Sequence, residues 1–491
     1  MRSSSLILSG RAPLAGHYPS AVAVALLALC PYLVLTTAIS LMQQVLRQEL
    51  GVSAFQLQLT VGLSNAAYAF GAVAAADLVQ RFPRRHVYLV CESGFVLSSV
   101  LVLSAQEISV FATGLVLQGL ATGMLLVAAL PPLILSHGAD RLPTTAAVIS
   151  LGLFGMVTFG PLVGGLVGTL DGWRYMFTSV AVLAAIGLTI GALVFERNEP
   201  PVPDLKFDWL AIPPALGATV LPFFGVAWLT HASFLDPLFL VPVIVGVLIG
   251  VLLVVSQYRS SSPLMPVRPV SNTLPVTGVA AAMLVGATFT TLIELTESYL
   301  VEVARFDTLE VGALLSPMLP GVVVAAILFR QLLTTRWTPC LALGGLLSVG
   351  VGAAVLLGTD TSSASYVVPI ASVFLGFGAG AGVTPGLFMA GLSAPAAQIG
   401  ATFALVELLR SEAAFLVGPA LLHLAVTKGI VDGFSLAVTI TLVATVAGAV
   451  LLVGVYLVGG AALRPPDLQA WITRRSTGYK SPALAARLRK A

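Results

Sequence analysis

The chain alternates between long apolar runs and short polar breaks along almost its whole length. An apolar run of about 18 or more residues is long enough to cross the hydrocarbon core of a bilayer as an α-helix. The runs are too long and too uniformly apolar for the alternating strands of a membrane β-barrel. The pattern predicts an all-α polytopic membrane protein with 14 transmembrane helices. These helices are expected at residues 21–44, 54–79, 87–104, 109–135, 143–169, 173–195, 209–230, 237–257, 273–301, 310–332, 338–358, 365–391, 397–425 and 434–459.

Composition supports the same conclusion. Of the 491 residues, 57% are hydrophobic and only 9% are charged, whereas soluble domains carry about 25% charged residues. The 47 Gly and 30 Pro residues are typical of membrane helices, in which neighbouring groups satisfy the backbone. A water-soluble fold is therefore excluded.

Basic residues orient the predicted helices. Of the 24 Lys and Arg residues, 19 fall on the side that carries both ends of the chain, 4 fall on the other side, and Arg410 lies within a helix. Cytoplasmic loops of membrane proteins carry an excess of Lys and Arg. We therefore expect a multi-pass protein of the plasma membrane with both termini in the cytoplasm.

Two longer polar breaks divide the helices into groups of six, two and six. ERNEPPVPDLKFD (196–208) follows the sixth helix, and RSSSPLMPVRPVSN (259–272) follows the eighth. The basic tail is expected to lie on the anionic cytoplasmic leaflet or to be disordered. The predicted domains are a cytoplasmic N-terminus (1–20), an N-terminal six-helix bundle (21–195), a cytoplasmic linker (196–208), an inserted helix pair (209–257), a second linker (258–272), a C-terminal six-helix bundle (273–459) and the tail (460–491).

The stretch TLIELTESYLVE (291–302) places acidic residues inside an otherwise apolar run. A charge at the bilayer centre costs about 2.5–3.5 kcal/mol, so an acid there is a candidate functional group. Glu294 and Glu297 are spaced to share one helix face. Two carboxylates so close in a poorly solvated site cannot both ionise cheaply. We predict that they take up and release protons; the alternative is that they only bind neighbouring helices.

A second acidic group lies in VELLRSE (406–412). Glu407 and Arg410 have the spacing of an intrahelical ion pair, which lowers the cost of burying both charges. Glu412 lies roughly 160° around the helix from Arg410, at 100° per residue. Either the ion pair or Glu412 is expected to face a central cavity, and both glutamates are candidates for proton coupling. A purely structural role for the pair is an equal alternative.

Several segments resemble the major facilitator superfamily, and specifically its fourteen-helix drug:proton antiporter group. FGPLVGG (159–165), followed by DGWRYMF (171–177), is similar to the antiporter motif GPxxGG and its downstream segment. PLMPVRPVSN (263–272) and residues 400–422 resemble further segments of that group. The resemblance implies two six-helix bundles that rock about a shared cavity, plus an inserted helix pair.

The GPxxGG segment has the composition expected of a gating helix. Gly160, Gly164 and Gly165 have no side chains, so a neighbouring helix can approach closely. Pro161 removes one backbone hydrogen bond and favours a bend. The alternative is that these residues only allow tight packing.

ADLVQRFPRR (76–85) resembles a cytoplasmic motif of the family, whose arginines take part in ion pairs between the bundles. Arg81, Arg84 and Arg85 match the motif, and Asp77 is a candidate for the acid that Gln80 replaces. This cytoplasmic lock and simple anchoring by positive charge are equally good interpretations. The acid of the family's first helix is absent from LVLTTAIS (33–40), and Leu115 replaces the arginine of its fourth helix.

These observations predict a secondary transporter that exports lipophilic or amphipathic small molecules against proton entry. The sequence contains no GxxxxGKS or GxxxxGKT phosphate-binding motif, no HExxH and no GxSxG, so neither a nucleotide-driven pump nor an enzyme is expected. We predict no cofactor, no metal and no nucleic-acid partner. The expected partners are the substrate, protons and membrane lipids, and a monomer is favoured. The alternatives are an exporter of one endogenous metabolite, lipid or secondary product, and a membrane scaffold or sensor without transport.

Overall fold

The computed structural model describes residues 12–170, 172–196, 208–260 and 263–488. Most of the predicted N-terminus and of the first linker lies outside the described residues. So do the first residue of DGWRYMF, two residues of the second linker and the last three of the tail.

The described residues are almost entirely helical. The membrane-crossing segments are α1 (Tyr18–Leu50), α2 (Ala54–Arg81), α3 (Arg84–Leu103), α4 (Ile108–Leu135), α5 (Leu142–Thr169), α6 (Trp173–Val194), α7 (Ile212–Trp228), α8 (Pro237–Arg259), α10 (Thr273–Glu302), α11 (Thr308–Leu315) with α12 (Met318–Leu332), α13 (Thr338–Leu356), α14 (Ala364–Ser393), α15 (Ile399–Thr427) and α16 (Ile430–Val458). Short helices between and after them are η1 (Ala139–Arg141), η2 (Trp209–Ala211), α9 (Val267–Val270), η3 (Ala396–Gln398), α17 (Leu468–Ile472) and α18 (Leu484–Leu488). By length and apolar composition, 13 segments of the described chain can span a membrane. The further long helix, α15, is the one that carries Glu407, Arg410 and Glu412.

Local chemistry explains where helices begin and end. Gly51 ends α1 in the left-handed conformation, with φ of 63°, which glycine adopts at little cost. Ser53 and Gln56 form a capping box at the start of α2. The segment predicted as one helix at 310–332 is instead two consecutive helices, α11 and α12, separated at Ser316 and Pro317. Proline has no N–H to continue the backbone ladder, which accounts for the break.

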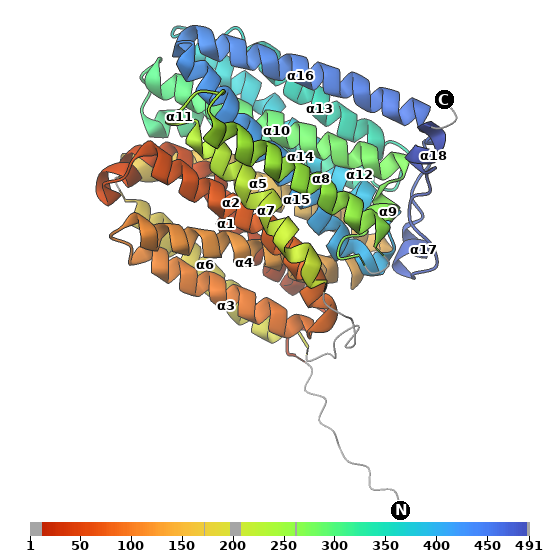
Figure 1. Cartoon of the computed structure of the whole chain (residues 1–491). Coiled ribbons are helices and arrows are strands. Elements are labelled where there is room, and N and C mark those ends of the chain that lie inside the picture. Colours follow the sequence, from red (N-terminus) through yellow and green to blue (C-terminus); the bar gives the residue numbers. More distant parts are fainter. Residues whose placement is uncertain (1–11, 171, 197–207, 261–262, 489–491) are drawn as a thin grey trace, which may run out of the picture.

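Small residues set the distances between helices. Within the N-terminal half, α2 packs closely on α4, where a Cβ at Gly119 or Gly123 would overlap the backbone of α2. Within the C-terminal half, α14 packs on α10, α12 and α13. Close approach of backbones through small residues is a common basis of helix association in membranes. The two bundles, α1–α6 and α10–α16, lie one above the other in Figure 1.

The inserted pair α7 and α8 lies across the junction of the two bundles (Figure 1). Helix α7 packs against α2 of one bundle and α15 of the other, and α8 packs on α7. Gly225 of α7 and Gly246 of α8 allow this contact, because a Cβ at either position would overlap the partner helix. Only 17% of the most apolar 18-residue stretch of α8 is buried, so α8 presents most of its surface to lipid.

The described part of the C-terminal tail is folded against the helix ends, so it is not disordered as one of the two expectations had it. Trp471 is fully buried, and its indole N–H donates to the carbonyl of Ala394 at 2.9 Å. The backbone N–H groups of Gly478 and Tyr479 donate to the carbonyl of Leu392 at 2.8 and 3.1 Å. Burial of Trp471 and these backbone hydrogen bonds hold the segment in place, which its basic composition did not predict. We call the helix ends covered by residues 464–488 the tail face.

Candidate functional site

A cavity of about 610 Å³ opens between the two bundles on the side opposite the tail face. Its walls come from α1, α2, α10 and the ends of α11 and α15. Four glutamines contribute to the wall together with three acids of the TLIELTESYLVE stretch. These polar lining residues are Gln43, Gln44, Gln48, Gln58, Glu294, Glu297 and Glu302. The cavity therefore presents carboxylates of one bundle to amide side chains of the other, and Arg47 of α1 lines the same cavity.

Glu294 and Glu297 both line this cavity. Glu297 is 3% exposed, and neither of its carboxylate oxygens has a hydrogen-bond partner among the described residues. The Ser40 side chain of α1 lies in the electrostatic surroundings of this carboxylate. Glu294 is half-buried and lies against Gly418 of α15, where a Cβ would stand 2.5 Å from its Oε2 atom. Gly418 thus leaves room for this carboxylate.

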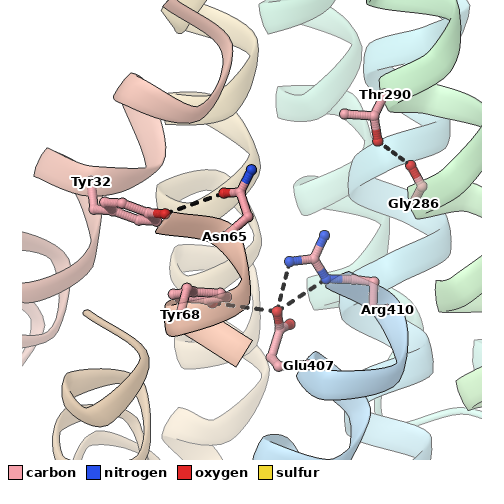
Figure 2. A network of polar contacts seen from close by, with 7 residues as sticks. All are labelled: Tyr32, Asn65, Tyr68, Gly286, Thr290, Glu407 and Arg410. Atoms are coloured by element: carbon pink, nitrogen blue, oxygen red, sulfur yellow. Dashed lines mark hydrogen bonds and ion pairs between the residues drawn. The ribbon is translucent and has the colours of Figure 1, made fainter. Parts of the chain in front are cut away.

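The ion pair of α15 lies deeper, beside a smaller cavity of about 50 Å³. Figure 2 shows Glu407 between Arg410 and Tyr68. The Glu407 Oε2 atom accepts from Nη2 and Nε of Arg410 at 2.6 and 3.0 Å. It also accepts from the Tyr68 hydroxyl at 3.3 Å. Because Tyr68 belongs to α2, this hydrogen bond joins the two bundles.

Aromatic and small residues position the pair. Tyr68 stacks on Tyr32 of α1, with ring centroids 5.7 Å apart. The Tyr32 hydroxyl donates to Oδ1 of Asn65 at 3.2 Å and contacts the Ser64 hydroxyl at 2.9 Å. On the other side, Gly286 of α10 lets the Arg410 side chain pass, since a Cβ there would lie 3.0 Å from Arg410 Cγ.

The remaining predicted acid lies apart from this cluster. Glu412 lines neither of the two cavities, and its Oε1 atom is buried without a hydrogen-bond partner among the described residues. Of the two arrangements that the spacing allowed, the structure has the Glu407–Arg410 pair facing the centre. Glu412 is therefore not brought together with the other candidates.

The GPxxGG glycines lie where α5 meets two other helices. A Cβ at Gly160 or Gly164 would overlap α1, and one at Gly165 would overlap the start of α11. Across the same contact, Gly312 of α11 leaves room for the carbonyl of Pro161. Helix α5 therefore contacts its own bundle and the other bundle through the same motif.

The basic cluster lies at the tail face. Asp77 forms an ion pair with Arg81 one turn along α2, and Arg85 donates to the carbonyl of Phe195 at the end of α6. Arg84 lies at the first turn of α3, with Arg474 of the tail in its electrostatic surroundings. These contacts order the end of the N-terminal bundle next to the tail.

Sequence reasoning missed the hydrogen-bond network around Glu407. Ser64, Asn65 and Tyr68 occur together in SNAAY (64–68), at the spacing of one helix face inside an apolar run. That polar group was a usable signal, because unpaired polar groups are costly within a membrane.

Two six-helix bundles around a polar central cavity define a helical membrane transporter. The chain belongs to the Major Facilitator Superfamily, whose family model matches residues 24–419. The predicted family and fold class are thereby confirmed, as is the expectation that the chain is a transporter rather than an enzyme.

Relatives of the chain include transporters and drug-resistance proteins. It is 27% identical to the MFS-type transporter YubD of Bacillus subtilis, over 80% of this chain and 78% of that protein. It is also 27% identical to the multidrug resistance protein B homolog of Mycobacterium tuberculosis, over 63% of this chain and 58% of the relative. It is 25% identical to the tetracenomycin C resistance and export protein of Streptomyces glaucescens, over 70% of this chain and 64% of the relative. The chain thus spans less than two thirds of the length of the last two.

Solved structures share the fold at low sequence identity. A POT family transporter in complex with a thioalcohol-conjugated peptide superposes with a TM-score of 0.65 at 14% identity, covering 89% of this chain and 96% of that one. The human organic anion transporter MFSD10 gives a TM-score of 0.63 at 14% identity, covering 89% and 99%. These similarities extend over both bundles.

Proposed function

We propose that the protein exports lipophilic or amphipathic small molecules in exchange for protons, by alternating access and as a member of the fourteen-helix drug:proton antiporter group. The observation that carries the proposal is the placement of Glu294 and Glu297 in the wall of the cavity between the bundles. The relatives named for multidrug resistance and drug export support the substrate class at low identity.

The environment of Glu297 suits a group that exchanges protons. Burial of a carboxylate away from any cation disfavours its charged form, and Glu297 has no hydrogen-bond partner among the described residues. Contact with the water of an open cavity reduces that penalty. A carboxylate whose surroundings change between two conformations binds a proton in one and releases it in the other.

The two ends of the seam between the bundles differ in a way that fits alternating access. At the tail-face end, Ser150 of α5 donates to the carbonyl of Gly380 on α14 at 3.3 Å. A Cβ at Gly400 of α15 would lie 3.1 Å from Val127 of α4. The seam is therefore packed toward the tail face and hollow on the opposite side. Because the tail face carries the excess of basic residues, we assign it to the cytoplasm and the cavity to the outside of a plasma membrane.

An ion gradient is a sufficient energy source for such export. One proton that crosses a potential of 100 mV releases about 2.3 kcal/mol, which corresponds to roughly fortyfold accumulation of substrate. A cavity whose wall combines apolar side chains with carboxylates and amides suits amphipathic compounds that share shape and charge more than detailed structure.

The test is transport by purified protein in proteoliposomes with an imposed proton gradient. Wild-type protein is expected to accumulate a fluorescent lipophilic cation and to move protons when the cation is present. The double variant with Glu294→Gln and Glu297→Gln is expected to lose proton flux.

The control variant is Glu107→Gln, which neutralises an exposed acid that lines neither cavity and is expected to keep flux. Unchanged flux in the double variant contradicts the coupling role of the α10 acids. Transport of one compound alone out of a broad panel supports an exporter of a single endogenous product. Absence of all substrate-dependent flux supports a scaffold.

A further inference from the structure

A third cavity, of about 40 Å³, lies where the inserted helix α7 packs across α2 and α15. Phe223 and Val226 of α7, Gly62 of α2 and Phe415 of α15 contribute to its wall. Glu294 lines it as well as the large cavity. The inserted pair therefore reaches the same carboxylate as the central bundles do.

This cavity adjoins the two described above. It shares Gln58 and Glu294 with the large cavity, and Asn65 and Phe415 with the deep one. Because walls are shared on both sides, Glu294 borders both the large cavity and the space beside α7.

The wall of this third cavity has a specific chemistry. The rings of Phe223 and Phe415 lie 6.4 Å apart between centroids, tilted by 44°. Glu294 supplies a carboxylate, and none of the described residues that line the cavity is basic. Aromatic faces and a carboxylate together attract organic cations, and apolar walls retain the body of the ligand.

We propose that Phe223 of the inserted helix, with Phe415 and Glu294, forms a subsite for the aromatic or alkyl groups of lipophilic organic cations. The inserted pair is then part of the substrate site as well as a cover for the seam between the bundles. The inference rests on the proposed export function for its biological use, whereas binding itself requires no proton gradient.

Helix α7 offers a matched control. Phe223 is buried against the cavity, whereas its neighbour Phe224 stacks on Trp228, with ring centroids 6.3 Å apart, and does not line the cavity. Both substitutions to alanine remove one phenyl ring from the same turn of the same helix. Only Phe223→Ala removes a ring from the subsite.

The test is equilibrium binding of radiolabelled tetraphenylphosphonium to purified protein in detergent, without a gradient. Phe223→Ala is expected to weaken binding roughly fivefold, the loss of about one cation–π contact, and Phe224→Ala to change it less than twofold. Phe223→Leu retains apolar volume without the ring, and it is expected to weaken binding to a similar extent. It serves as the test variant if Phe223→Ala fails to fold. Tetraethylammonium, a quaternary ammonium that can form the same cation–π contact, is expected to bind more weakly to Phe223→Leu than to the wild type.

Equal binding of tetraphenylphosphonium by wild type and Phe223→Leu overturns the proposal, and so does an equal loss in the Phe224→Ala variant. Absence of binding to the wild-type protein also overturns it. Binding that follows the expected order, in protein that moves no protons, supports the subsite and contradicts the export mechanism. The two proposals can therefore fail separately.

Discussion

Glu297 on α10 and Glu407 on α15 are both 3% exposed, yet their surroundings differ. Glu407 accepts hydrogen bonds from Arg410 and from Tyr68 of the other bundle. Glu297 has no hydrogen-bond partner among the described residues and faces a cavity. Equal burial therefore leads to opposite chemistry, because the partners of a carboxylate decide whether its charge is compensated.

The comparison assigns different tasks to the two sites. The carboxylate that is paired with arginine holds α15 against α2 through its hydrogen bond with Tyr68. In the mechanism that we propose, the carboxylate without such a partner changes its protonation state when the cavity opens or closes. We expect mutation of the paired site to lower the free energy of unfolding, and mutation of the unpaired site to reduce proton flux.

The largest effect on stability is expected from Arg410→Ala. This change leaves Glu407 buried without its cation, which costs about 3 kcal/mol in the free energy of unfolding. The measurement is unfolding of purified protein in mixed detergent micelles with increasing denaturant. The double variant with Glu407→Gln and Arg410→Gln is expected to recover most of the loss, and a double variant as unstable as Arg410→Ala contradicts the pairing argument.

A smaller loss of stability is expected from Tyr68→Phe, which removes only the hydroxyl that donates to Glu407. Hydrogen bonds between membrane helices contribute about 0.6 kcal/mol on average. The bond joins the two bundles, so the variant is also expected to shift the balance between conformations. Cysteine cross-linking across the tail-face end of the seam, compared with the wild type, measures that shift. A loss as large as that of Arg410→Ala would show that the hydroxyl, and not the arginine, compensates Glu407.

Glu297→Gln is expected to leave the free energy of unfolding nearly unchanged, because an amide replaces a carboxylate that no cation compensates. Proton flux, by contrast, is expected to fall to background in the liposome assay. The same denaturant series measures the first quantity. A loss of stability comparable to that of Arg410→Ala would indicate a hidden ion pair and would reverse the comparison.

The smallest effect is expected at Asp360, an acid in the loop between α13 and α14. The Ser362 hydroxyl and the backbone N–H groups of Ser363 and Ser362 lower the pKa of Asp360 from 3.8 to about 2. A lowered pKa stabilises the folded state above the unfolded pKa, and the contribution is lost as the pH falls through the folded pKa. The wild type should therefore exceed Asp360→Asn slightly in melting temperature at pH 6, and the difference should vanish between about pH 4 and pH 2.

Transport by the Asp360→Asn variant should keep the pH profile of the wild type between about pH 5 and pH 8, because a group with a pKa of about 2 does not titrate there. A changed transport profile would show that acids outside the central seam contribute to coupling. Asp360 thus provides an exposed carboxylate, hydrogen-bonded through Oδ1, against which the two buried ones are compared.

Much of the fold could be predicted because the signals are local. Long apolar runs located the helices, and the predicted and observed limits of α4, α5 and α6 differ by at most one residue. The break at Pro317 and the folded tail were not predicted. The first depends on how one proline is accommodated within an apolar run, and the second on the burial of Trp471 against the end of α14.

The candidate site was predictable only in part. The spacing of Glu407 and Arg410 indicated a pair within one helix, because helical geometry brings such neighbours together. The Tyr68–Glu407 hydrogen bond joins residues 339 positions apart, and no periodicity relates them. The same holds for Phe223, which lines one cavity with Glu294 only because α7 packs across the junction of the bundles.

The amino-acid sequence by itself determined that this chain is a helical membrane protein, where its helices lie and which few residues bear charge inside them. Those properties follow from hydropathy and from contacts within one or two helical turns. The tertiary structure alone decided which carboxylate receives a cation, which one faces the cavity and which helix closes the seam beside it. These outcomes depend on the packing of helices that are distant in the chain, where one small residue such as Gly286 or Gly418 determines whether a charged side chain fits.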